Sequence, residues 1–144
     1  MPKQIQLKTL RDTEKLAIKL AQNLRGGSIL ALVGELGAGK TTFTQALGRA
    51  LGIKKNIKSP TFTVLQTYTI PRTSKVHANT FCHVDAYRIS DPHELDTLGL
   101  YDYLSDKDTI TIIEWADRVR TLLPTHTRWI TLQNIDGKRT AILD

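Results

Sequence analysis

The chain has 144 residues, 40% of them hydrophobic and 24% charged, with a formal net charge of +6 at pH 7. This length suits one compact domain spanning residues 1–144, and the composition excludes a disordered or fibrous protein. The longest strongly apolar run, residues 29–33, is far too short to cross a bilayer, and the N-terminus has no apolar leader, so we expect a cytoplasmic protein without membrane association.

The positive charge raises the question of a polyanionic partner. Lys54, Lys55 and Lys58 form a local basic cluster. No aromatic residues alternate with these lysines as in a base-stacking surface, so a solvated surface is the favoured interpretation, with direct nucleic-acid binding as the alternative. The single cysteine, Cys82, cannot form an internal disulfide and is interpreted as a small core residue.

The first half of the chain predicts the order helix, strand, loop, helix. Thr9 and Asp12 offer a capping box, and the apolar residues that follow recur at helical spacing, which predicts a helix over about 10–24. Residues 28–33 form an apolar run between glycines, which is typical of a strand buried on both faces. After a glycine-rich turn, the apolar spacing predicts a second helix over about 43–51.

The second half predicts mainly strands. Residues 61–69 and 76–84 are rich in Thr, Val, Tyr and Phe, and the segment between them is typical of a hairpin turn, so an antiparallel pair is expected. A short helix with Asp91 as its N-cap and Pro92 as its first residue should run up to Gly99, a second buried strand should occupy 109–113, and a hairpin turning at 134–137 should close the chain. The predicted fold is a three-layer α/β domain whose central sheet is mostly parallel, with antiparallel strands added.

The strongest motif lies between the first buried strand and the second helix. Residues 34–41 form a complete GxxxxGK[ST] sequence in the strand, loop and helix context of a P-loop, which predicts a P-loop NTPase-like domain. Its backbone amides should surround the phosphates of a nucleotide, with Lys40 at the β and γ phosphates and Thr41 on Mg²⁺. The predicted nucleotide-binding residues of this loop are Gly34, Glu35, Leu36, Gly37, Ala38, Gly39, Lys40, Thr41 and Thr42.

Two carboxylates follow predicted strands and are candidates for the magnesium shell that a P-loop requires. Glu114 ends the more apolar strand and is the better candidate for a metal ligand. Asp85 ends the other strand and could orient the attacking water or share the metal. Either residue could instead be a helix cap or a surface carboxylate, and the division of labour between them is open.

Three further features have both a functional and an ordinary interpretation. The segment Ser59-Pro60-Thr61 lies where many P-loop proteins place a loop that senses the γ phosphate, although it is also a common turn sequence. Trp115 would lie either near the nucleotide or in the core, and residue chemistry alone favours the core. The histidines lack metal-ligand spacing with any cysteine, so no zinc site is predicted.

The nucleotide is expected to be ATP. A GTPase should have Asp-x-x-Gly after a strand and Asn-Lys-x-Asp for guanine, but Asp85 is followed by Ala-Tyr-Arg and the second motif is absent. A small-molecule kinase with Arg118 and Arg120 as lid arginines remains compatible with the motifs. A nucleotide-gated binding module is a further alternative.

Taken together, four motifs resemble the TsaE family. They are the GxLGAGKT loop at 34–41, the SPT-aromatic loop at 59–62, the HxDxYR segment at 83–88 and the Glu-Trp pair at 114–115, in the family's order and spacing. The resemblance covers nearly the whole chain and implies a Mg²⁺-dependent ATPase. It also implies the TsaB and TsaD proteins as partners, whose complex modifies adenosine in tRNA with threonylcarbamoyl and would be reset between turnovers, tRNA being the substrate of the assembly.

The resemblance further implies residue roles. Slow hydrolysis by the isolated chain is expected, because no residue is an obvious arginine finger and Arg88 is the nearest candidate. The segment around Thr13 is implied in the adenine pocket, and Ala116 departs from the proline that many members carry after Glu-Trp. The implied roles are phosphate binding for Lys40 and Thr41, catalysis for Asp85 and Lys40, metal binding for Thr41, Glu114 and Asp85, and nucleotide contact for Ser59, Thr61 and Trp115.

Overall fold

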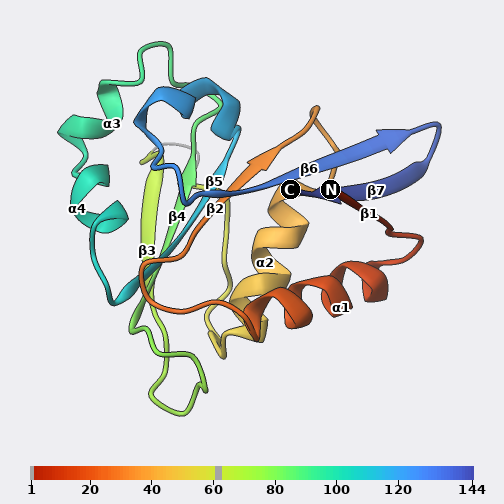
Figure 1. The fold of residues 1–144 in the computed structure, drawn as a ribbon, viewed down its shortest axis with the longest axis horizontal. Coiled ribbons are helices and arrows are strands. Elements are labelled where there is room, and N and C mark those ends of the chain that lie inside the picture. Colours follow the sequence, from red (N-terminus) through yellow and green to blue (C-terminus); the bar gives the residue numbers. More distant parts are fainter. Residues whose placement is uncertain (1, 61–62) are drawn as a thin grey trace.

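The computed structural model describes residues 2–60 and 63–144, and within them seven strands form one sheet with helices on both faces (Figure 1). The strands are β1 (Lys3–Gln6), β2 (Ile29–Val33), β3 (Leu65–Thr69), β4 (Thr80–Asp85), β5 (Thr109–Glu114), β6 (Arg128–Ile135) and β7 (Lys138–Leu143). The helices are α1 (Leu10–Ala21), α2 (Lys40–Ala50), α3 (Glu94–Thr97), α4 (Leu100–Leu104) and the 3₁₀ helix η1 (Ala116–Leu122).

The sheet has a parallel centre and antiparallel edges. Its strand order is β1-β7-β6-β2-β5-β4-β3, and β6, β2, β5 and β4 pair with one another in parallel. Antiparallel β7 and β1 extend one edge, and antiparallel β3 forms the other. This arrangement confirms the predicted α/β fold with a mostly parallel central sheet and added antiparallel strands.

Helices cover both faces of the sheet, so two separate cores form. Helices α1 and α2 lie over one face, where Leu30 and Leu32 of β2 join the first core (Figure 1). Ile29 and Ala31, which alternate with them, join the second core beneath α3, α4 and η1. The continuous apolar run of β2 is explained by burial on both faces, as the sequence predicts.

The carboxyl ends of three parallel strands meet at one edge of the sheet. Leu32 of β2 is in register with Glu114 of β5, and Asp85 of β4 is in register with the same glutamate. The loop after β2 therefore begins beside both candidate carboxylates. In α/β sheets, this edge is where ligands generally bind.

Two predicted helix boundaries differ from the structure. The capping box of α1 is present, with Asp12 N donating to Thr9 Oγ1 at 3.2 Å, but the helix ends at Ala21, and residues 22–24 form a turn. The prediction that Asp91 is the N-cap of a helix beginning at Pro92 is wrong, because α3 begins at Glu94 and His93 is its N-cap. The Asp91 carboxylate instead accepts a hydrogen bond from His93 N at 3.0 Å and stabilises the preceding turn.

The two predicted hairpins are present with altered lengths. Strands β3 and β4 pair antiparallel but are shorter than predicted, so residues 70–79 form a longer connection. Hairpin β6–β7 turns at Asp136 and Gly137, whose φ angles of 54° and 79° fit the predicted Asp-Gly turn. Residue patterns did not predict β1, α4 or η1, although the family resemblance implies an N-terminal strand before the helix that contains Thr13. No helix in the described ranges is long and apolar enough to cross a membrane.

Candidate nucleotide-binding site

The loop between β2 and α2 needs glycine at two positions for different reasons. Gly39 has a φ of 103°, a left-handed conformation that glycine adopts without strain. Gly34 lies so close to β6 that a Cβ there would be 2.4 Å from the carbonyl oxygen of Leu132. Among the described residues, no side chain caps the N-terminus of α2, so its first amides can donate to an anion.

A cavity of about 480 Å³ lies between this loop and the strand ends. We call it the phosphate-side cavity. It brings together most of the residues that the sequence predicts to bind nucleotide or metal. Those that line it are Leu36, Gly37, Gly39, Lys40, Thr41, Thr42, Ser59, Asp85, Glu114 and Trp115.

Lys40 is held by its own loop. Its Nζ donates hydrogen bonds to the carbonyl oxygens of Gly34 at 2.6 Å and Glu35 at 2.8 Å, and it lies 4.0 Å from the centre of the Trp115 ring. Burial lowers the pKa of Lys40, while the negative charges of Glu114 and Asp85 oppose that shift. Gly34 and Glu35 therefore contribute carbonyl groups that orient the lysine, rather than lining the cavity.

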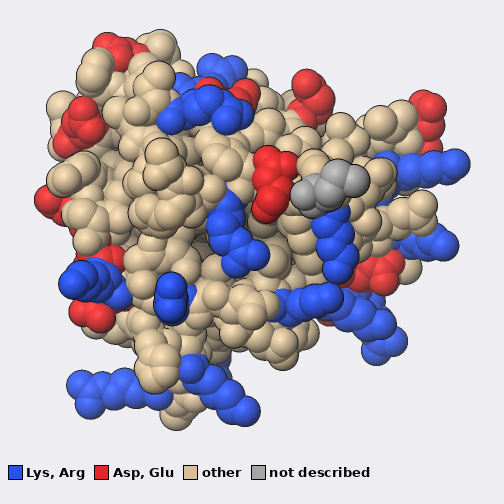
Figure 2. Space-filling model, in the orientation of Figure 1, with Lys and Arg blue, Asp and Glu red and all other residues tan. Residues whose placement is uncertain are grey.

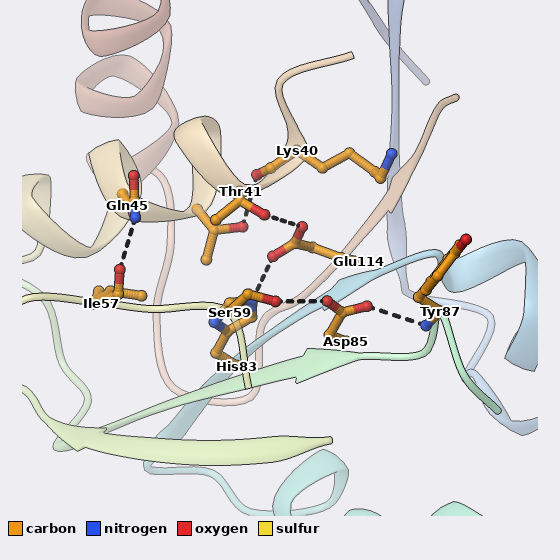
Figure 3. A network of polar contacts seen from close by, with 10 residues as sticks. Lys40, Thr41, Gln45, Ile57, Ser59, His83, Asp85, Tyr87 and Glu114 are labelled. Atoms are coloured by element: carbon orange, nitrogen blue, oxygen red, sulfur yellow. Dashed lines mark hydrogen bonds and ion pairs between the residues drawn. The ribbon is translucent and has the colours of Figure 1, made fainter. Parts of the chain in front are cut away.

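Glu114 is a buried carboxylate held from two sides (Figure 3). Its side chain is only 2% exposed, and Oε1 accepts a hydrogen bond from Thr41 Oγ1 at 2.8 Å. Its other oxygen, Oε2, accepts a hydrogen bond from Nε2 of His83. His83 is fully buried on β4, and its Nδ1 has no hydrogen-bond partner in the part of the chain that the structure describes. The glutamate is thus fixed between the first turn of α2 and β4.

Asp85 is held separately, by the loop that follows α2. Its Oδ2 accepts a hydrogen bond from Ser59 Oγ at 2.7 Å, and its Oδ1 accepts one from Tyr87 N at 3.0 Å (Figure 3). Ser59 is in turn connected to α2, because Gln45 Nε2 donates to the carbonyl of Ile57 at 2.8 Å. The two carboxylates of the cavity therefore have different supports.

Backbone contacts also connect the Ser59 loop to the end of β4. Val64 N donates to the carbonyl of Pro60, and the carbonyl of Val64 accepts from Asp85 N, each at 2.8 Å. Val64 has a φ of 64°, which is strained for a β-branched residue. The predicted nucleotide contact Thr61 lies outside the described residues.

Trp115 forms an aromatic wall of the cavity. It has a φ of 58°, and its partly buried ring packs against the second core while also lining the cavity. The Tyr87 ring lies 4.9 Å from it between centroids, and the Arg118 guanidinium lies 5.5 Å and 5.7 Å from the Tyr87 and Trp115 rings. The sequence offered a position for Trp115 either in the core or near the nucleotide. In the structure, its ring both contacts the core and borders the cavity.

A second cavity of about 220 Å³ lies on the other side of α2's first turn. We call it the base-side cavity. It is lined by the apolar side chains of Leu7, Ala38 and Phe43 together with the hydroxyl of Thr13. Ala38 and Thr13, both implicated by the sequence, are thus on this side. The two cavities share Gly39, Thr42 and Arg139.

The oxygen donors of the phosphate-side cavity fit a magnesium ion. Thr41 supplies a hydroxyl, and Glu114 and Asp85 supply carboxylates, which are the hard ligands that Mg²⁺ prefers. Within residues 2–60 and 63–144, no group of three or more His, Cys, Asp or Glu side chains is placed to hold a metal. A site of this kind suits a cation that takes its other ligands from phosphates and water.

Sequence reasoning missed two residues of this region. His83 belongs to the HxDxYR segment and is not predicted to bind zinc, but the sequence assigns it no other role, although its position two residues before Asp85 on β4 places both side chains on the same face. Arg139 was not considered, because only the pairing of β6 with β2 brings the last hairpin beside the P-loop.

Comparison with known proteins gives consistent matches over most of the chain. A family model described as threonylcarbamoyl adenosine biosynthesis protein TsaE matches residues 7–141. The tRNA threonylcarbamoyladenosine biosynthesis protein TsaE of Haemophilus influenzae is 34% identical over 131 residues, covering 90% of this chain and 78% of that protein. The protein of the same name from Rickettsia bellii is 36% identical over 134 residues, covering 92% and 88%.

A solved structure agrees. The crystal structure of Bacillus subtilis YdiB superposes with a TM-score of 0.78 at 26% identity, covering 99% of this chain and 84% of that one. The family match includes the P-loop, both strand-end carboxylates and most of the final hairpin. The chain belongs to the TsaE family, which takes part in threonylcarbamoyladenosine modification of tRNA.

Proposed function

We propose that this protein is a Mg²⁺-dependent ATPase of the cytoplasm that supports threonylcarbamoylation of tRNA by TsaB and TsaD, resetting their complex between turnovers. The observation that carries the ATPase proposal is the hydrogen bond from Thr41 Oγ1 to Glu114 Oε1 at 2.8 Å. It joins the P-loop to a buried strand-end carboxylate, which is the pairing that holds magnesium in P-loop enzymes.

The two carboxylates lie in different surroundings, which supports different roles for them. Glu114 is buried and bonded to Thr41, so it belongs to the metal side, where Mg²⁺ would neutralise charge on the β and γ phosphates. Asp85 is partly exposed, and each of its oxygens accepts one hydrogen bond, which leaves acceptor capacity for a water molecule. We therefore assign Asp85 to orienting the water.

Hydrolysis then requires three actions from the chain. Asp85 holds water in line with the γ phosphorus. As the new P–O bond forms, the bond to the bridging oxygen of ADP breaks, and a proton of the water passes to an oxygen of the released phosphate. Lys40 stabilises the negative charge on the β and γ phosphates once its ammonium exchanges the carbonyls of Gly34 and Glu35 for phosphate oxygens. The amides of the first turn of α2 hold the phosphates in place.

Two cavities on either side of Gly39 and Thr42 support a nucleotide rather than a free phosphate as ligand. The phosphates would occupy the side with the carboxylates, and the adenine would occupy the base-side cavity, where Leu7 and Phe43 offer apolar contacts to an aromatic ring and the remaining lining is largely polar. Thr13 would contribute a polar contact there. Ser59 and Trp115 would close the phosphate side.

A kinase has less support. Arg120 lies 3.9 Å from the Trp129 ring, and Arg118 is stacked on Tyr87 and Trp115, so neither of the expected lid arginines lines the phosphate-side cavity. Arg88 does line it and is the candidate for stabilising charge during hydrolysis. On the face shown in Figure 2, Lys and Arg side chains lie at several separate places and do not form one continuous patch, so this face gives no particular support to direct nucleic-acid binding.

The test is multi-turnover modification of tRNA by purified TsaB and TsaD with Mg-ATP and threonylcarbamoyl-adenylate, with and without this protein. We expect modification to continue beyond one round per complex only when the protein is present. Lys40→Ala should abolish both this effect and ATP hydrolysis, whereas Lys54→Ala, which removes an exposed lysine outside the site, should change neither.

Two outcomes would contradict parts of the proposal. If wild-type protein makes no difference to multi-turnover modification, the pathway role fails. If Asp85→Ala abolishes hydrolysis, leaves ATP bound and still supports many rounds, the protein is a nucleotide-gated binding module. Phosphorylation of a small acceptor molecule would instead favour the kinase.

A further inference from the structure

Strand β3 leaves one edge of the sheet open. It is the last strand in the sheet order, and its partner within the described ranges is β4. Just beyond β3, Ile70 N donates to the carbonyl oxygen of Asn79 at 2.8 Å. Because bonded and non-bonded pairs alternate along an antiparallel ladder, Thr67 and Thr69 direct their N–H and C=O groups away from β4. These backbone groups therefore face the open edge, where no other described strand pairs with them.

A cavity of about 490 Å³ lies beside this edge. It is lined by three consecutive residues of β3, namely Thr67, Tyr68 and Thr69, and by Lys54 and Lys55 of the loop that follows α2. Consecutive side chains of a strand point to opposite faces of the sheet, so a cavity bordered by all three β3 residues follows the edge of the strand. We call it the edge groove.

The edge groove is basic and has no acidic counterpart. Lys54 and Lys55 are exposed, and no ion pair among the described residues includes either of them. Lys55 Nζ lies 5.9 Å from the centre of the Tyr68 ring, which places its charge beside β3. None of the residues that line the groove is acidic, and the whole segment 36–84 contains no Asp or Glu. A ligand in the groove therefore meets positive charge that no acidic residue of this segment neutralises.

The strand itself has no feature that would prevent pairing. Proteins commonly protect an open edge with a charged residue or a proline within the strand. The sequence of β3, Leu-Gln-Thr-Tyr-Thr, contains neither, and threonine and tyrosine favour extended structure. The two lysines of the groove lie beside the strand instead, so they select the charge of a strand that pairs there rather than blocking all pairing.

Charge and backbone chemistry identify the class of ligand. A second copy of this chain paired through the same edge would bring Lys54 and Lys55 of both molecules together, and like charges repel. Phosphate oxygens of a nucleic acid accept hydrogen bonds but cannot donate to the carbonyl groups of Thr67 and Thr69. An extended peptide supplies both donors and acceptors at the spacing of a strand, and acidic side chains on it match the lysines.

We propose that the edge groove binds an extended acidic segment of another protein, which pairs with β3 as an additional strand. Backbone hydrogen bonds to Thr67 and Thr69 hold the segment, and its carboxylates contact Lys54 and Lys55. The length of β3 accommodates a segment of about 17 Å, at roughly 3.4 Å per residue. The groove shares no lining residue with the phosphate-side or base-side cavity, so this inference does not depend on the proposed function.

Fluorescence anisotropy tests the proposal with fluorescein-labelled peptides of about nine residues, in which glutamate alternates with valine, threonine or tyrosine. The variant Lys54→Glu/Lys55→Glu reverses the charge of the groove. Lys15→Glu/Lys19→Glu makes the same change at exposed positions of α1. Thr67→Pro removes an edge N–H that β4 does not use. We expect saturable binding to the wild-type chain and to the α1 variant, and a loss of about tenfold or more in each of the other two variants.

A second peptide series separates strand pairing from charge attraction. Methylation of the backbone nitrogens is placed either on the glutamates or on the residues between them. Because the lysines fix the face on which the glutamates lie, only one of these two sets of N–H groups faces β3. One methylated form should therefore lose binding and the other should keep it. This series also provides the test if circular dichroism shows that Thr67→Pro does not fold.

Several results would overturn the proposal. Absence of saturable binding by every peptide excludes the site, and equal binding by Lys54→Glu/Lys55→Glu places the peptide elsewhere. Equal binding of both methylated forms, or undiminished binding by a folded Thr67→Pro variant, reduces the contact to charge attraction. If labelled oligouridine binds in a manner that depends on Lys54 and Lys55 while the peptides do not bind, the groove is a nucleic-acid surface instead.

Discussion

Glu114 is a carboxylate in an unusually enclosed position, with a side chain that is 2% exposed. Burial of a charge is costly unless hydrogen bonds replace the lost water. Thr41 and His83 supply those bonds, one to each oxygen. In the proposed enzyme, Thr41 would turn towards magnesium, so His83 would be the partner that continues to hold the glutamate in the orientation that binds the metal.

Replacing His83 with leucine should raise the Mg²⁺ concentration needed for half-maximal ATP hydrolysis by about tenfold, as is typical when a residue supporting a metal ligand is lost. His83→Gln should have a smaller effect, because its amide can still donate to Glu114. A Mg²⁺ titration of steady-state hydrolysis measures both variants. Equal Mg²⁺ requirements in His83→Leu and wild type would show that His83 is only a core residue and does not support metal binding by Glu114.

At the scale of elements, α2 positions the Ser59 loop through close packing. A Cβ added to Gly48 would lie 2.0 Å from Cδ1 of Ile57, and Ile57 is buried. The same segment accepts the hydrogen bond from Gln45. Gly48 thus allows the loop to approach the helix, and the loop then brings Ser59 to Asp85.

Gly48→Ala should destabilise the protein by about 1–2 kcal/mol, because overpacking outweighs the gain in helix propensity of about 1 kcal/mol. Adding Ile57→Val removes the clashing methyl group and should restore part of the loss. Urea unfolding of the two single variants and the double variant gives the coupling free energy. If the two effects are simply additive, the predicted clash between Gly48 and Ile57 is wrong.

The sequence predicted the elements around the P-loop well, but it did not predict which side chains from other strands contact them. The P-loop, β2 and α2 follow from residues adjacent in the chain, and Glu114 and Asp85 could be recognised because each ends an apolar strand. The contact of His83 with Glu114 depends on the register between β4 and β5. Strand β1, with the sequence Lys-Gln-Ile-Gln, has no apolar alternation to mark it.

At the scale of the whole molecule, Cys82 lies on β4, next to the edge strand β3, and its side chain is part of the second core. Its thiol is completely buried, and burial raises its pKa to about 12. The folded state therefore keeps the thiol proton at pH values where the unfolded chain, with a pKa near 9.0, loses it. Stability from this group is fully present below pH 9 and is lost as the pH rises towards 12.

Cys82→Ala should therefore lose stability less steeply than wild type above pH 9, with a difference in slope of up to about 1.4 kcal/mol for each pH unit. Both proteins contain the same other titrating groups, and the cavity left by alanine has a cost that does not depend on pH. Urea unfolding at several pH values from 8 to 11 measures the difference. Parallel stability curves would show that the Cys82 thiol has the same pKa in the folded and unfolded states.

The polar strand β1 has a consequence at the edge of the sheet. It contributes little to the core, since Ile5 is its only apolar residue and only partly buried. It does pair with the backbone of β7 from residue 140 to residue 143. An exposed strand edge can recruit a strand from another molecule, whereas a short strand with lysine and glutamine makes a poor template for such pairing. Strand β1 therefore covers the edge of β7 with a strand that is itself a poor template for further pairing.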